Sequence, residues 1–298
     1  MTITLTLTAH DKDLGDGFTV RRLLPAARRQ SVGPFLFFDH FGPVTVEPES
    51  GHDVRPHPHI GLATVTYLFD GAITHRDNLG YTQVIEPGAI NWMTAGRGIV
   101  HSERKPDALR GTRYRNHGIQ LWAALPQAHE ETAASFVHTA AAAIPQLRVG
   151  DATVRVLIGD AFGVQSPVAT FAPTLYLDIQ LPAGGQFTLP PLARERALYA
   201  VDGDVAVDGA TVAAHALGLL EEGATASVTA SAATRMMVIG GDPLDGPRHI
   251  WWNFVSSRKD RIVQAASDWE ALRADAGMGQ VPGETEFIPL PERRFLAG

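Results

Sequence analysis

The sequence contains no cysteine. This absence excludes disulfide bonds, a thiolate nucleophile and a metal site with cysteine ligands. A metal ion in this protein must therefore be held by histidine, aspartate or glutamate. A chain without cysteine also fits a reducing compartment.

Basic tracts and long apolar runs are scarce as well. The formal net charge is −7 and no basic tract is longer than a pair, which argues against nucleic acid as a main partner. No run approaches the roughly 18 apolar residues of a membrane span. Residues 1–6 alternate polar and apolar side chains, which predicts a strand and not a signal peptide. We therefore expect a cytoplasmic protein without a membrane partner.

The remaining composition is that of a globular chain with room for two domains. It has 298 residues, of which 45% are hydrophobic and 19% charged. Glycine and proline recur every few residues between short β-rich runs, a pattern typical of antiparallel sandwiches or barrels, so we predict an all-β fold. A change in composition near the alanine run at 140–143 predicts domains at 1–130 and 145–298 with a linker at 131–144.

The end of the chain has a different pattern. Ser256 or Ser257 can cap a helix, and apolar residues from Ile262 to Leu272 recur near helical spacing before Gly277. We therefore predict an amphipathic C-terminal helix that packs on a sheet.

Two pairs of potential metal ligands lie at i, i+2 spacing: His57 with His59, and His101 with Glu103. In a strand these spacings place both members of a pair on the same face. Two neighbouring strands would thus gather three imidazoles and one carboxylate. Such a set suits a divalent transition metal and leaves two positions open at an octahedral ion. A closed structural metal site is the alternative.

A weak internal repeat relates the two halves of the chain. Residues 67–71 (YLFDG) are echoed by residues 199–203 (YAVDG), and similar runs follow each. Counted back from the glycines, the positions of His57 and His59 correspond to Leu189 and Pro191, neither of which binds metal. We predict a second copy of the domain that has lost its site.

Several motifs resemble the pirin family of the cupin superfamily. Residues 57–68 (HPHIGLATVTYL) look like the first pirin signature and residues 91–103 (NWMTAGRGIVHSE) like the second. The segments 38–43 (FDHFGP), 117–122 (HGIQLW) and 251–255 (WWNFV) are also similar to pirins. One departure is Ala63, where many cupins and some pirins carry a glutamate.

The resemblance implies two tandem jelly-roll (cupin) barrels with the metal in the first. The family's ligands fall on His57, His59, His101 and Glu103, and its usual metal is iron. We expect one divalent ion, Fe(II) foremost, with Zn, Ni, Cu or Mn as alternatives. Some pirins open the flavonol quercetin with dioxygen, as quercetin 2,3-dioxygenases do, whereas mammalian pirin is known as a redox-dependent transcriptional cofactor.

Two functions therefore stay open at this point. One is a dioxygenase for a flavonol-like aromatic substrate, with Glu103 as the catalytic base. The other is a non-catalytic, redox-responsive iron protein that acts on a protein partner. Candidate pocket residues for the enzyme are Phe37, Trp92, Met93 and His117, although such residues also form barrel cores. We expect His75 to lie in a polar loop at the rim, not among the ligands.

Overall fold

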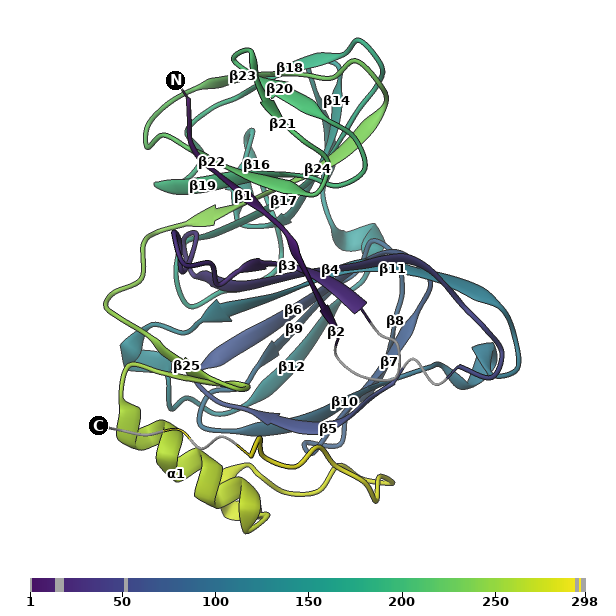
Figure 1. The fold of residues 1–298 in the computed structure, drawn as a ribbon, viewed down its shortest axis with the longest axis vertical. Coiled ribbons are helices and arrows are strands. Elements are labelled where there is room, and N and C mark those ends of the chain that lie inside the picture. Colours follow the sequence, from purple (N-terminus) through teal and green to yellow (C-terminus); the bar gives the residue numbers. More distant parts are fainter. Residues whose placement is uncertain (1, 14–18, 51–52, 293–294, 296–298) are drawn as a thin grey trace. The chain divides into compact units, whose positions relative to one another are not determined.

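The computed structural model describes residues 2–13, 19–50, 53–292 and 295, and it consists of two jelly-roll barrels and one C-terminal helix (Figure 1). The chain divides into two compact units. Unit 1 comprises residues 1–12, 21–39 and 139–243, and unit 2 comprises 13–20, 40–138 and 244–298. Each barrel is built from two antiparallel sheets.

The larger sheet of unit 2 has the strand order β12-β9-β6-β11-β4-β3-β2, in which β2 spans His10–Asp13 and β3 spans Thr19–Leu24, and the smaller one has the order β5-β10-β7-β8. The first residues of β4, 35–39, are assigned to unit 1. The side chains of Phe41, Leu68 and Ile85 from both sheets meet in a buried cluster. The strands are β4 (Phe35–Val46), β5 (Val54–His59), β6 (Leu62–Asp70), β7 (Ile73–Asp77), β8 (Thr82–Ile85), β9 (Ile90–Thr94), β10 (Ile99–Arg104), β11 (Tyr114–Ala124) and β12 (Ser135–Thr139).

Unit 1 repeats this plan with strand orders β1-β22-β19-β24-β17-β14-β13 and β18-β23-β20-β21. The short strands β15 and β16 pair with each other. The strands of these sheets are β1 (Ile3–Thr8), β13 (Gln146–Val149), β14 (Ala152–Ile158), β15 (Asp160–Ala161), β16 (Val164–Gln165), β17 (Thr174–Leu181), β18 (Gln186–Leu189), β19 (Glu195–Ala200), β20 (Val205–Val207), β21 (Ala210–Val212), β22 (Ala216–Leu220), β23 (Ala226–Thr229) and β24 (Thr234–Gly241).

The matching strand orders confirm the internal repeat. The series β22-β19-β24-β17 corresponds to β9-β6-β11-β4, and β18-β23-β20-β21 corresponds to β5-β10-β7-β8. Leu189 ends β18, the counterpart of the strand that ends at His59. It therefore takes the place of His59, and not that of His57, with which counting from the glycines had matched it. Its side chain is fully buried in the apolar core of unit 1. Apolar side chains therefore fill the position that histidines take in unit 2.

The predicted C-terminal helix is present as α1 (Lys259–Glu270). It begins without a side-chain cap: Arg258 is the N-cap residue, and Ser256 Oγ accepts a hydrogen bond from its backbone N–H. Ile262 and Trp269 are buried against Ile60 and Val100, which belong to the segment around β5 and to β10. In Figure 1, α1 lies beside these two strands. Val263 and Leu272, two of the apolar residues in the predicted helical pattern, are exposed.

The structure divides the chain differently from the boundaries expected from composition. The N-terminal strand β1 pairs with β22 in unit 1, whereas β25 (His249–Trp251), β26 (Phe254–Ser256) and α1 belong to unit 2. In the described part of the chain, three short 3-10 turns connect strands, namely Asp107–Leu109, Gln127–His129 and Ala141–Ala143, and a fourth, Ala274–Ala276, follows α1. Among the described residues, no helix combines the length and apolarity needed to cross a membrane.

Candidate metal centre

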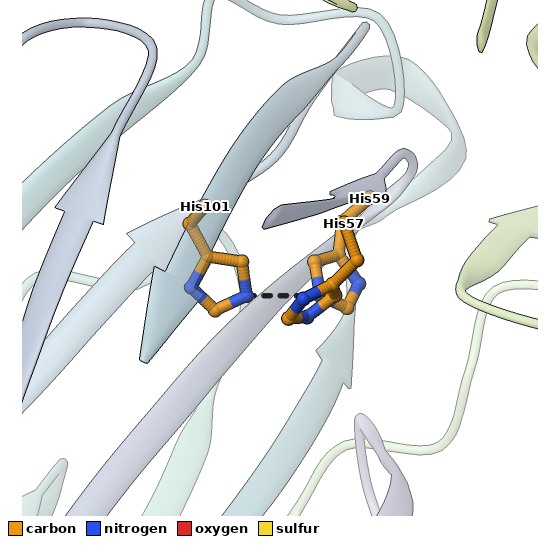
Figure 2. Close-up of side chains that lie close together, drawn as sticks. All are labelled: His57, His59 and His101. Carbon is orange, nitrogen blue, oxygen red and sulfur yellow. Dashed lines mark hydrogen bonds between the residues drawn. The ribbon is translucent and has the colours of Figure 1, made fainter. Parts of the chain in front are cut away.

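Strands β5 and β10 bring three histidines together inside the barrel of unit 2. The strands are antiparallel neighbours, and His101 pairs directly with His57. His59 lies two residues beyond His57 and therefore faces the same side. Figure 2 shows the three rings turned toward one another from these two strands. The alternation of side chains along each strand thus places the ligands as the spacing predicts.

The geometry of the three rings fits one metal ion. One ring nitrogen from each of His57, His59 and His101 lies within 4.8 Å of the others. The Nε2 atoms of His59 and His101 are 3.1 Å apart. Two nitrogens bound about 2.1 Å from one ion at about a right angle are separated by about 3 Å. The triad could therefore hold a metal, and imidazole nitrogen suits Zn, Cu, Fe and Ni alike.

Burial keeps these rings in the neutral form that binds metal. It lowers the pKa of His57 to about 4, against the raising effect of a hydrogen bond to a backbone carbonyl. It also lowers the pKa of His59 and His101 well below the ordinary value, and the neighbouring His57 adds to this effect. Neutral imidazole has one nitrogen with a free lone pair. In His57, Nδ1 lies 2.9 Å from the carbonyl of Arg55 and donates to it, which leaves Nε2 for the metal.

Glu103 lies two residues after His101 on the same face of β10, but it is not part of the group of mutually close metal ligands. Its Oε1 accepts a hydrogen bond from Gln120 Nε2 at 2.6 Å. Burial raises the pKa of this carboxyl to about 7, although the hydrogen bond from Gln120 acts in the opposite direction. The cluster of mutually close ligand atoms consists of the three histidines alone among the described residues. A ligand role for Glu103 stays a prediction.

The strand on the other side of β10 contributes a pair that we had placed elsewhere. His75 lies in β7, where it is only 3% exposed, and not in a polar loop at the rim. Asp77 is 1% exposed and faces the same side. In the register of β7 with β10, Asp77 pairs with His101 and His75 pairs with Glu103. The expectation for His75 was therefore wrong, because the loop begins only after Asp77.

The larger sheet of unit 2 turns a polar row toward the triad. Gln120 pairs with Thr66, and Thr66 pairs with Asn91 on the next strand. His138 in β12 places Nδ1 2.7 Å from Asn91 Oδ1. The buried Asn91 Nδ2 has no hydrogen-bond partner among the described residues. Buried polar groups are seldom left unpaired, so this row has capacity for a polar ligand or water.

A second row on the same face is more apolar. Trp122 pairs with Thr64, which pairs with Met93 on β9. The Trp122 ring meets the ring of His59 edge to face, with 5.2 Å between centroids. Met93 therefore shares a face with residues that contact the triad. Gln120 and Trp122 lie in a motif that we had quoted without assigning them roles, and their i, i+2 spacing was the available signal.

The other predicted pocket residues have different surroundings. Trp92 is adjacent to Met93 in the strand and so points to the opposite face, where its Nε1 donates to Thr94 Oγ1. His117 packs against Phe69, and its Nε2 is 2.7 Å from that of His40. Phe37 belongs to unit 1, where the Arg22 guanidinium lies 4.3 Å over its ring. We retain only Met93 of these residues in the pocket proposed below.

Comparison with known proteins agrees with this architecture. Residues 17–123 match the model of the Pirin family, and residues 176–275 match that of the Pirin C-terminal cupin domain. A pirin-like protein of Caulobacter vibrioides is 45% identical over 97% of this chain and 100% of its own length. A putative quercetin 2,3-dioxygenase of Pseudomonas aeruginosa is 36% identical over 92% of this chain and 85% of its own.

A solved structure resembles the whole chain. The crystal structure of a quercetin 2,3-dioxygenase from Acinetobacter baumannii superposes with a TM-score of 0.88 at 31% sequence identity, covering 97% of this chain and 96% of the other. The two family models lie one on each repeat of the barrel, and the triad lies on the matched N-terminal part. The chain therefore belongs to the pirin family of two-barrel cupin proteins.

Proposed function

We propose that this protein is a metal-dependent dioxygenase that opens flavonols of the quercetin type with dioxygen. The observation that carries the proposal is the convergence of three buried, neutral imidazoles beside a buried carboxyl group. Relatives and a similar structure named as quercetin 2,3-dioxygenases support the choice of substrate class. The expected cytoplasmic location stays a prediction.

The proposed cofactor is one Fe(II) ion held by His57, His59 and His101, with Glu103 as the predicted fourth ligand. Three imidazoles and one carboxylate suit iron, and Zn, Ni, Cu and Mn remain alternatives. When bound, the ion would supply Lewis acidity and open coordination positions for an oxygen-containing substrate and dioxygen. The protein contributes neutral ligands and a barrel interior that excludes bulk water.

Glu103 is the proposed base for the flavonol hydroxyl. Gln120 occupies Oε1 of the carboxylate, so Oε2 is the atom that would bind the metal and, once released from it, accept the hydroxyl proton. The hydrogen bond from Gln120 fixes the orientation of the carboxylate while the proton moves. Removal of this proton makes the flavonol more electron-rich, which favours its reaction with dioxygen.

The proposed substrate-binding site lies on the inner face of the larger sheet of unit 2. Asn91 and Thr66 can hydrogen-bond to substrate hydroxyl groups, whereas Met93 and Trp122 offer apolar contact for an aromatic ring. A polyhydroxylated aromatic molecule needs both kinds of contact. This mixture favours a flavonol over a sugar or an organic acid.

We test the proposal with Fe(II)-loaded protein, quercetin and an oxygen electrode. The wild-type protein should consume oxygen and bleach the quercetin absorbance, and metal-free protein should do neither. Glu103→Gln should lower kcat by a factor of about 100 or more, because a positioned base contributes about that much. Iron-loaded protein that leaves quercetin unchanged in air would refute the dioxygenase proposal, and full turnover by Glu103→Gln would exclude this residue as the base.

A further inference from the structure

β10 carries His101 between two strands, each of which has a pair of functional side chains at i, i+2. On one side β5 offers His57 and His59, and on the other β7 offers His75 and Asp77. The pair on β7 is as deeply buried as the triad itself. His75 does not belong to the group of mutually close metal ligands. The pair therefore needs an explanation other than metal coordination.

We propose that Asp77 and His75 form a hydrogen-bonded chain that orients the His101 ring and fixes its tautomer for metal binding. Asp77 Oδ2 lies 2.9 Å from His75 Nε2. His75 Nδ1 in turn lies 3.4 Å from His101 Nδ1. The far nitrogen of His101, Nε2, is the one that faces His59 across 3.1 Å. This inference rests only on the metal-binding part of the proposed function.

The positions of the protons in this hydrogen-bonded chain follow from its first member, Asp77. A carboxylate only accepts hydrogen bonds, so His75 must carry its proton on Nε2. The Nδ1 atom of a neutral His75 then has a lone pair and can accept from His101, which must carry its proton on Nδ1. His101 Nε2 is left with a bare lone pair toward the metal. The opposite tautomer of His101 would set two lone pairs against each other and block the metal with a proton.

The surroundings hold the first two members of this hydrogen-bonded chain, Asp77 and His75, in place. Asp77 Oδ1 accepts backbone hydrogen bonds from Leu79 at 2.9 Å and Tyr81 at 3.1 Å, which leaves Oδ2 directed at His75. The ring of Phe136 stacks on His75, with 4.1 Å between centroids and 9° between planes. The His75 ring therefore cannot turn without losing its stacking on Phe136 and its hydrogen bond to Asp77.

His57 is oriented by different means. The carbonyl oxygen of Arg55 accepts a hydrogen bond from Nδ1–H of His57, and this bond lies within one strand. His101 depends instead on the neighbouring strand β7. Hydrogen-bond partners of this kind commonly change metal affinity by about 10-fold to 100-fold. His75 and Asp77 are thus positioning residues for the metal ligand His101.

The first test measures Co(II) affinity of the full-length Asp77→Asn variant by competition with a chelator. The amide can present N–H to His75 and reverse the chain, so we expect binding weakened by about 10-fold to 100-fold and an altered visible spectrum of the bound cobalt. The control is Thr74→Val in the same strand, because Thr74 is equally buried but faces the other side. Unchanged affinity and spectrum in Asp77→Asn would overturn the proposal.

The second test needs no variant and holds even if Asp77→Asn does not fold. Long-range proton–nitrogen NMR correlations in the Zn(II)-loaded wild-type protein report which ring nitrogen carries the proton. We expect the proton on Nε2 of His75 and on Nδ1 of His101. The reverse assignment for either ring would refute the chain. Neither test uses quercetin, so a failure here is distinguishable from a failure of the dioxygenase proposal.

Discussion

Burial acts in opposite directions on the two kinds of titratable residue at the metal centre. It lowers the pKa of the three histidines and raises the pKa of Glu103. A histidine with a lowered pKa costs stability as the pH falls, because the unfolded chain then binds protons that the folded state does not. Glu103 costs stability as the pH rises from about 4.5 to about 7, since the folded state keeps a proton that the unfolded chain has lost.

We predict that His57 makes the metal-free protein less stable at pH 5 than at pH 7. The folded state keeps this ring neutral down to about pH 4, whereas the unfolded chain protonates it near pH 6.5. This difference removes about 2 kcal/mol from the free energy of unfolding between the two pH values. Urea denaturation at both values measures it. His57→Gln should lose about 2 kcal/mol less than the wild type, and substitution of the exposed His10 by glutamine should leave the loss unchanged.

At the scale of elements, β10 has two faces with separate tasks. His101 and Glu103 point into the barrel, whereas Ser102 and Arg104 point outward to the segment that follows α1. Glu284 of that segment accepts from Ser102 Oγ at 2.8 Å and forms an ion pair with Arg104. The C-terminal segment thereby covers the outer face of the strand that carries the metal ligands.

We predict that Glu284→Gln lowers the free energy of unfolding by about 2–4 kcal/mol, because the largely buried Arg104 then loses the most buried of its charged partners. Glu286 provides a matched control, since it pairs with the same arginine but has a side chain that is 51% exposed. Glu286→Gln should change stability by no more than about 0.5 kcal/mol. Equal effects of the two substitutions in thermal or urea denaturation would contradict this account of the C-terminal segment.

At the scale of the whole molecule, the two barrels share a topology but differ in what fills them. Unit 2 encloses histidines, carboxyl groups and amides, whereas the corresponding interior of unit 1 holds aliphatic side chains such as Leu189 and Val228. An apolar interior stabilises a barrel through burial, and a polar one gives up part of that stability for a binding site.

We predict that Leu189→Ala destabilises the protein by about 2–5 kcal/mol through the cavity that it leaves, without changing the bound metal per folded chain. His59→Ala, at the corresponding strand end of unit 2, should abolish metal binding instead. Chemical denaturation together with elemental analysis separates the two effects. A parallel loss of metal in Leu189→Ala would show that the core of unit 1 is needed for the metal site.

The sequence alone was sufficient for the triad, the repeat and the helix. His57, His59 and His101 could be grouped because the alternation of side chains along a strand is a local property. The repeat and α1 follow from patterns within short segments as well. Counting residues also indicated that Leu189 replaces a ligand, although the count matched it with His57 and the strand pairing matches it with His59.

Only the tertiary structure decided which strands are neighbours and in what register. Pairing between segments far apart in the chain places His75 and Asp77 next to His101. It also brings Gln120 to Glu103. The same pairing puts Met93, but not Trp92, on the sheet face that carries Gln120. The same pairing assigns β1 to unit 1 and α1 to unit 2. A shift of one residue in any register would reverse these faces, and no local pattern in the sequence fixes that choice.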